Sequence, residues 1–213
     1  MSEVFYSYFS YFLHPFKVNS YFRKKRQDFY GPFLVDQNVP EERDFLELDF
    51  YQILIVSWPF FIIHSFYSIF FINVANFVVM SFDVGEMINP HIIIYAALVQ
   101  VTFFPLFFWA YAKLWVVIVE FFGSLFSLDE KNIEEVSSQV VGVSLVSHVF
   151  LLVPIIGGVI RHFAFLVYLF AGLRKNLGLS VTKSFMVILS PLFILGLMVF
   201  MFFLLLATII AGF

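Results

Sequence analysis

The stretch FYQILIVSWPFFIIHSFYSIFFI, residues 50–72, decides the fold of this chain. It contains no Lys, Arg, Asp or Glu. About 20 apolar residues in helical conformation are needed to cross the roughly 30 Å of hydrocarbon in a bilayer. Residues 50–72 are therefore predicted to form a membrane-spanning helix.

Four more apolar stretches follow along the chain. In the second, residues 91–112, the apolar run continues to Phe122, which is too long for one crossing. Lys113 and Glu120 indicate that this helix leaves the hydrocarbon near residue 113 and continues at the interface. The remaining predicted spans are residues 139–156, 159–174 and 185–211.

The composition indicates a membrane protein along its whole length. Of the 213 residues, 62% are hydrophobic and 13% are charged, whereas a soluble domain is nearer half apolar and a quarter charged. The 33 Phe residues are spread over nearly the whole chain, which excludes a soluble domain with a single anchor. The predicted fold class is all-α, a polytopic membrane helix bundle with five transmembrane helices. Residues 1–49 are predicted to form a cytoplasmic or interfacial aromatic-basic segment, and residues 50–213 the five-span membrane domain.

The distribution of basic residues predicts the orientation, because short loops rich in Lys and Arg stay in the cytoplasm. With five spans and a cytoplasmic N-terminus, all but one of the 12 Lys and Arg residues lie inside, and only Arg161 lies outside. If residues 139–174 formed one broken span instead, more basic residues would move outside. Five spans are therefore predicted, with the C-terminus outside.

The N-terminal segment is rich in aromatic side chains and ends in a basic cluster, Arg23, Lys24, Lys25 and Arg26. It lacks the basic start and the small-residue cleavage site of a signal peptide. Aromatic side chains prefer the headgroup level, and a juxtamembrane basic residue is attracted to anionic lipid by about 1 kcal/mol. Residues 1–26 are therefore predicted to lie on the cytoplasmic leaflet, with the four basic side chains contacting anionic headgroups. The alternative is a helix packed on the protein's own bundle.

The third predicted span carries a polar face made of Gly142, Ser144, Ser147 and His148. Polar residues inside a span are costly and usually face the bundle interior. One interpretation is packing against a neighbouring helix, where small residues allow close approach and hydroxyls bond across. The other is a site for a proton, an ion or a small ligand, which would make the chain a small transporter or permease subunit.

Two segments are predicted to start or turn helices. Ser127 and Glu130 have the spacing of a capping box. Pro154, Gly157 and Gly158 are predicted to form a tight hairpin turn between the third and fourth spans. Just after this turn, Arg161 is expected to snorkel to the outer interface.

Signals for enzymatic chemistry are weak. The chain has no Cys, which excludes disulfides and thiolate metal sites, and its five His residues lack the spacing that chelates a metal from one helix face. Glu134 and Glu135 are interpreted as acidic residues in the first turn of a helix. The sequence has no phosphate-binding glycine loop or nucleophile motif, and its basic cluster beside aromatic residues favours lipid over nucleic acid. The protein is predicted to be non-enzymatic, with no catalytic residue, cofactor or metal.

Several motifs from the third span onward resemble the Yip domain family, the Ypt-interacting proteins. They are Gly142-Val-Ser144-Leu145, Pro154-Ile-Ile-Gly157, Gly172-Leu-Arg174, Leu177-Gly178-Leu-Ser180 with Lys183, and Pro191 in the last span. Near the N-terminus, His14-Pro15-Phe16 is similar to the opening of bacterial members. Asp28-Phe-Tyr-Gly-Pro-Phe33 is similar to a motif of eukaryotic members, where the motif leads directly into the first span; here a polar-rich stretch intervenes.

The resemblance covers roughly residues 91–213 and, more weakly, residues 1–33. It implies a five-span protein with a cytoplasmic N-terminus, in agreement with the basic residues. Eukaryotic members act in vesicle traffic and bind small Rab-type GTPases through their cytoplasmic parts, whereas bacterial members have no settled activity. The resemblance favours a bacterial member in the cytoplasmic membrane, or a Golgi or ER protein if the chain is eukaryotic. The predicted function is membrane organisation or recruitment of a protein partner at the cytoplasmic face.

Overall fold

The computed structural model describes residues 2–30, 45–82, 89–126 and 133–211. Within these ranges the chain consists of helices and short connections, without a strand. Five of the helices there are long and apolar enough to cross a membrane. The all-α prediction is therefore confirmed, as is the presence of five helices of this kind. The predicted capping box, Ser127 and Glu130, and the end of the Asp28–Phe33 motif lie outside the described residues.

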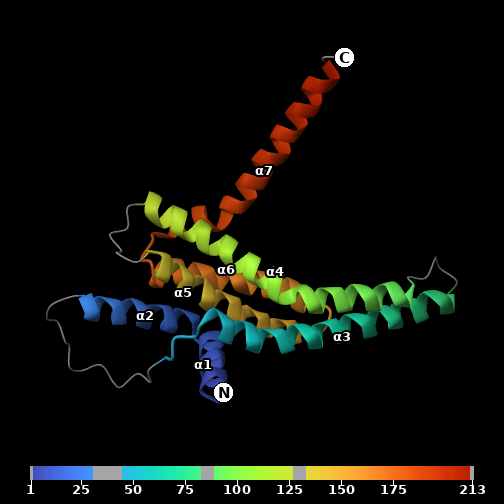
Figure 1. Cartoon of the computed structure of the whole chain (residues 1–213), viewed down its shortest axis with the longest axis horizontal. Helices are drawn as coiled ribbons and strands as arrows, with labels where there is room; N and C mark the ends of the chain where they lie inside the picture. Colours follow the sequence, from blue (N-terminus) through green and yellow to red (C-terminus); the bar gives the residue numbers. More distant parts are fainter. Residues whose placement is uncertain (1, 31–44, 83–88, 127–132, 212–213) are drawn as a thin grey trace.

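Helices α3 (Phe50–Phe82) and α4 (Pro90–Leu125) form an antiparallel hairpin, the longest feature of the molecule (Figure 1). Phe61 of α3 stacks on Phe104 of α4, with ring centroids 4.4 Å apart. Aromatic side chains of this kind line the contact between the two helices, so the Phe-rich sequence is used for packing as well as for lipid exposure.

Helix α3 is longer than the predicted first span. It continues past residue 72 to Phe82 instead of ending at the polar residues that follow. The Asn73 side chain donates to the carbonyl of Ile69 in the preceding turn, at 2.8 Å. Because the polar side chain is hydrogen-bonded within its own helix, it does not end the helix at this position.

Helix α4 is also one long element. The Asn89 side chain accepts from the backbone N–H of His91 at 2.9 Å, and Pro90 occupies the first helical position. Both features favour a helix start. The helix runs without a break past the predicted span end at residue 112 to Leu125, in agreement with the prediction that the helix continues past residue 113.

The third predicted span combines two kinds of helix. Helix α5 (Ile133–Leu145) continues directly into the tighter 3₁₀ helix η1 (Val146–Leu152). After a turn at residues 153–156, α6 (Gly157–Lys175) returns beside α5. The change to 3₁₀ geometry differs from the prediction, which treated the polar spacing as α-helical throughout.

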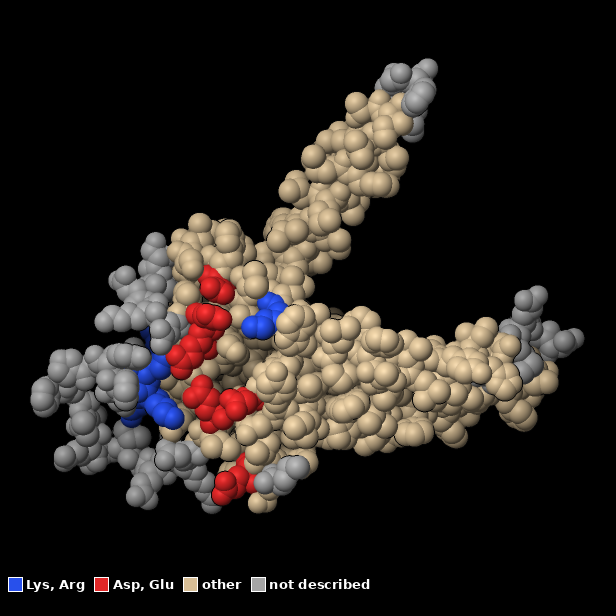
Figure 2. All heavy atoms as spheres, viewed as in Figure 1, with Lys and Arg blue, Asp and Glu red and all other residues tan. Residues whose placement is uncertain are grey.

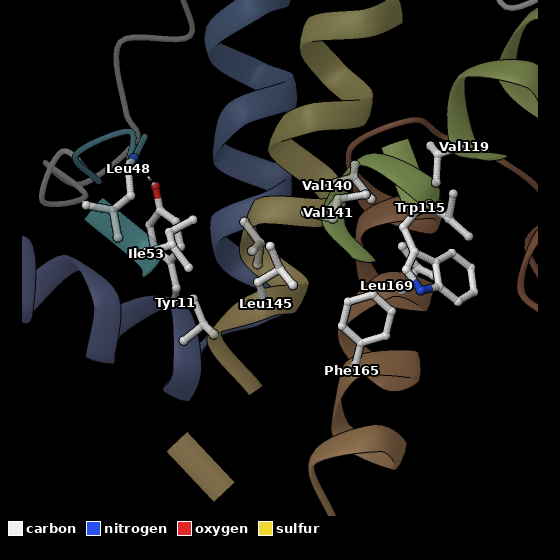
Figure 3. Packing of buried hydrophobic residues seen from close by; sticks show 14 of the residues in the cluster. Tyr11, Leu48, Ile53, Trp115, Val119, Val140, Val141, Leu145, Phe165 and Leu169 are labelled. Atoms are coloured by element: carbon white, nitrogen blue, oxygen red, sulfur yellow. Dashed lines mark hydrogen bonds between the residues drawn. The ribbon is translucent and has the colours of Figure 1, made fainter. Parts of the chain in front are cut away.

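Helix α5 lies at the centre of the hydrophobic core (Figure 3). Val140 and Leu145 are fully buried. Figure 3 shows the α5 side chains between two groups, one around Tyr11 and the other around Trp115 and Phe165. The core therefore joins the N-terminal segment to the helices that follow it.

The N-terminal segment forms helices α1 (Ser2–Leu13) and α2 (Pro15–Tyr30), which fold onto the bundle. Tyr8 is fully buried and its hydroxyl shares a 2.9 Å hydrogen bond with Ser57 Oγ of α3. Burial raises the pKa of the Tyr8 and Tyr11 phenols, which therefore stay protonated. One face of the segment thus packs on the bundle, as in the alternative interpretation. The other face is exposed and carries Phe5, Tyr6, Phe9, Leu13 and Phe16.

Helix α7 (Val181–Ala211) diverges from the bundle (Figure 1). Its first turns are anchored, since Ser184 and Val187 are fully buried. After Pro191, every side chain described from Leu192 to Ile209 is exposed. This uncharged part of α7 has only apolar or weakly polar side chains to present, so lipid is the environment that it fits.

Candidate functional site

Arg26 joins three parts of the chain at one end of the bundle. Its Nη1 donates to Gln139 Oε1 of α5 at 2.7 Å, and its Nη2 donates to Asn176 just after α6, to Oδ1 at 2.5 Å and to the carbonyl at 3.2 Å. Hydrogen bonds between a charged donor and neutral acceptors are stronger than neutral ones, so this side chain fixes the position of α2 against the bundle. We call the end of the molecule around Arg26 the basic end.

The other members of the basic cluster have different surroundings. Arg23 is half-buried, with its guanidinium close to the backbone of Gly178. Gly178 has a φ of 72°, a conformation that glycine adopts readily. Lys24 and Lys25 are exposed. All four side chains were predicted to contact headgroups; Arg26 is engaged within the protein, Lys24 and Lys25 are exposed, and headgroup contact stays a prediction.

A cleft of about 720 Å³ opens between α3, α4 and α5 near Arg26. Its floor is apolar and includes Ile53, Gly142 and Leu145. Five carboxyl side chains line it: Glu47, Asp49, Glu120, Glu134 and Glu135. Figure 2 shows acidic side chains gathered toward the end of the molecule where α2 lies. We call this feature the acidic cleft; its potential favours a cationic ligand.

The acidic cleft was not predicted from the sequence. Glu134 and Glu135 do lie in the first turn of α5, as interpreted from the sequence. Glu120, interpreted from the sequence only as an interfacial residue, lies on a different helix, α4. Glu47 precedes α3 and accepts a hydrogen bond from Gln139 across the edge of the cleft. Residues this far apart in the chain give no local pattern, so only the tertiary structure brings them together.

The polar face of the third span is buried. Ser144, Ser147 and His148 are at most 2% exposed. The Ser144 hydroxyl donates to the carbonyl of Val140 at 2.7 Å. Ser147 Oγ has no hydrogen-bond partner within the described part of the chain. Gly142 differs from the others, because it lines the acidic cleft.

Arg161, which was expected to snorkel to an interface, lies between two imidazoles. His148 Nδ1 lies 2.6 Å from the Leu145 carbonyl, and His148 Nε2 lies 2.8 Å from Arg161 Nη1. His162 Nε2 lies 2.9 Å from Arg161 Nη2. A guanidinium only donates, so both Nε2 atoms accept and both rings are neutral in this arrangement. The snorkelling prediction missed this bond because His148 lies across the turn.

The two glycines that follow the turn between η1 and α6 have different surroundings. Pro154 lies in the turn, and Gly157 and Gly158 open α6. A Cβ at Gly157 would lie 2.4 Å from the carbonyl oxygen of Phe150, whereas at Gly158 the nearest atom would be 4.0 Å away. Gly157 therefore allows the close approach of α6 to η1, and Gly158 is not needed for it.

Comparison with known proteins gives no relative. The chain matches no family model, no curated protein and no solved structure. The described residues also contain no group of His, Asp and Glu side chains that could hold a metal ion.

Proposed function

We propose that this chain is a non-enzymatic, Yip-type integral membrane protein that recruits a protein partner at its cytoplasmic face. The N-terminus is inside and the C-terminus outside. The acidic cleft carries the proposal, because a concave site with an apolar floor and five carboxyl groups suits a Lys- and Arg-rich segment of a partner.

Contacts at the basic end support this orientation. Segments predicted to lie inside the cell meet there, although they are far apart in the sequence. Arg26 of the N-terminal segment bonds to Asn176 in the connection between α6 and α7. Lys183 of α7 lies over the ring of Phe126 at the end of α4, 4.8 Å from its centroid. Basic residues that share one end of a membrane bundle indicate its cytoplasmic side.

Transport through the third span has less support. The hydroxyl of Ser144 and both ring nitrogens of His148 already have partners inside the bundle. Neither residue is among those that line the acidic cleft. Side chains that already hydrogen-bond inside the bundle are better suited to helix packing than to ligand exchange.

The partner proposal is tested by neutralising cleft carboxylates. Glu120→Gln combined with Glu134→Gln keeps the side-chain shape and removes two charges. Each exposed ion pair contributes up to about 1 kcal/mol, so recovery of the partner should fall roughly tenfold. The measurement is quantitative mass spectrometry of proteins that co-purify from membranes in mild detergent. Glu3→Gln, the same change on α1, is the control. Equal recovery with the double variant and the control would contradict the proposal.

Lys24 and Lys25 allow a separate test of headgroup binding. Changing both to Gln should weaken retention of anionic lipid by about 2 kcal/mol at low salt, and less at high salt, without lowering the melting temperature. Arg26→Gln is the contrasting variant: it should lower the melting temperature, because it removes hydrogen bonds to two other segments. Native mass spectrometry of bound lipid and thermal melts distinguish the two. Unchanged lipid retention in the double variant would show that the basic cluster serves in packing and does not bind headgroups.

A further inference from the structure

The turn between η1 and α6 lies partway along the α3–α4 hairpin, not at its end. His64 Nδ1 is 3.2 Å from the carbonyl of Leu151, which places the end of η1 beside the middle of α3. From His64 to Phe82, α3 extends about 27 Å further, at 1.5 Å per residue. Figure 1 shows the hairpin continuing past the ends of the other helices in the bundle. We call this part of α3 and α4 the overhang.

The surface of the overhang matches lipid. Phe66, Phe70, Phe77 and Phe82 are each more than 60% exposed. On the face shown in Figure 2, no charged side chain lies on the overhang or on the far part of α7. The exposed part of α7, from Leu192 to Ile209, is also about 27 Å long. Both lengths approach the roughly 30 Å of the hydrocarbon core.

The hairpin of α5, η1 and α6 has a different surface. The most apolar part of α5 and η1 is 61% buried inside the protein and that of α6 is 39% buried, against 22% for α3, 17% for α4 and none for α7. If its turn reached the outer surface of the membrane, the overhang would project into water by about 27 Å, with its phenylalanines exposed. Five full crossings would require both the turn and the far end of the overhang to lie at the outer surface of the membrane. The overhang separates the two by about 27 Å, so they cannot both lie there.

We propose that α3, α4 and α7 cross the bilayer, and that the α5–η1–α6 hairpin stays at the inner interface with its tip in the inner leaflet. The tip, residues 153–156, is Val-Pro-Ile-Ile, and Ile155 and Ile156 are 71% and 55% exposed. A water-facing turn would carry polar residues instead. Such a tip is a hydrophobic wedge whose ligand is the acyl-chain region of the inner leaflet.

This arrangement also explains the single exception in the distribution of basic residues. Arg161 lies one turn into α6, close to the tip. With the tip in the inner leaflet, Arg161 lies near the inner headgroups, and all 12 Lys and Arg residues fall on the cytoplasmic side. Three crossings and five crossings both leave the C-terminus outside, so the orientation in the proposed function is unchanged. The acidic cleft then belongs to a larger cytoplasmic head.

The absence of cysteine makes the test direct. Three single variants are compared: Ser81→Cys at the far end of α3, Ile156→Cys at the tip and Ser138→Cys near the start of α5. All three positions are exposed in the protein. A charged, membrane-impermeant maleimide is applied to intact cells, to inside-out vesicles and, after denaturation, to the same samples in SDS.

We expect Ser81→Cys to react in intact cells and Ser138→Cys in inside-out vesicles. Ile156→Cys should react at least tenfold less than either until SDS is added. Bimane attached to the purified Ile156→Cys protein and reconstituted should be quenched by lipids with a nitroxide on the acyl chain. Labelling of Ile156→Cys in intact cells would overturn the proposal in favour of five crossings. Labelling of Ile156→Cys in inside-out vesicles alone would show that the tip is not inserted in the leaflet, and would also overturn the proposal. Reversed labelling of Ser81→Cys and Ser138→Cys would contradict the orientation in the proposed function instead.

Discussion

Gly157→Ala is expected to lower the melting temperature of the detergent-solubilised protein by roughly 6–12 °C. The added Cβ would lie 2.4 Å from the carbonyl oxygen of Phe150 and 3.3 Å from the Cα of Leu151. Both are backbone atoms, so no side-chain rotation relieves the overlap, and α6 must move away from η1. Overpacking of this kind costs about 3 kcal/mol, and 1 kcal/mol corresponds to about 2–4 °C for a protein of this size.

Gly158→Ala is the matched control, one residue further along the same helix. Its Cβ would have His64 Nε2 as nearest atom, at 4.0 Å, which is ordinary contact. Alanine is also favoured over glycine in a helix by up to about 1 kcal/mol, so the melting temperature should stay the same or rise slightly. Thermal melts of the two variants in one detergent provide the comparison. Equal melting temperatures would show that η1 and α6 do not approach each other as closely as the structure has them.

The long apolar runs predicted helix type and approximate position well, because they depend on local composition. The ends of the helices were harder to predict. Asn73 looked like the start of a loop, but its side chain bonds to Ile69 and the helix continues. The 3₁₀ geometry of η1 was also missed, since the polar face of this segment is compatible with either helix when only spacing is known.

Features that depend on tertiary contacts could not be predicted from one sequence. The acidic cleft combines carboxyl groups from before α3, from α4 and from α5, and the segment before α3 is far from the other two in the sequence. Arg161 was assigned an interfacial role from its position at the start of a span. Its bond to His148 crosses a turn, and predicting it would have required the relative position of η1 and α6.

Gly172→Ala should also destabilise the protein, by about 1–3 kcal/mol, and here a second substitution should offset the loss. Gly172 is buried where α6 crosses α5. Its added Cβ would lie 2.5 Å from Cγ1 of Val140, a fully buried residue on α5. Valine in a helix has one strongly preferred rotamer, so it cannot turn aside, and the two helices must separate.

Val140→Ala removes the atoms that the new methyl group would meet. Alone it should cost about 1.5–2 kcal/mol, at about 0.8 kcal/mol for each buried carbon lost. Combined with Gly172→Ala it should cost less than the sum of the two, by at least about 0.5 kcal/mol, because the new methyl fills part of the space. Gly196→Ala is the control, since nothing lies within 4 Å of a Cβ there. Melts of the four variants against the parent complete the cycle. Strictly additive losses would mean that Gly172 and Val140 do not touch, and the packing of α5 on α6 would then differ from that in Figure 3.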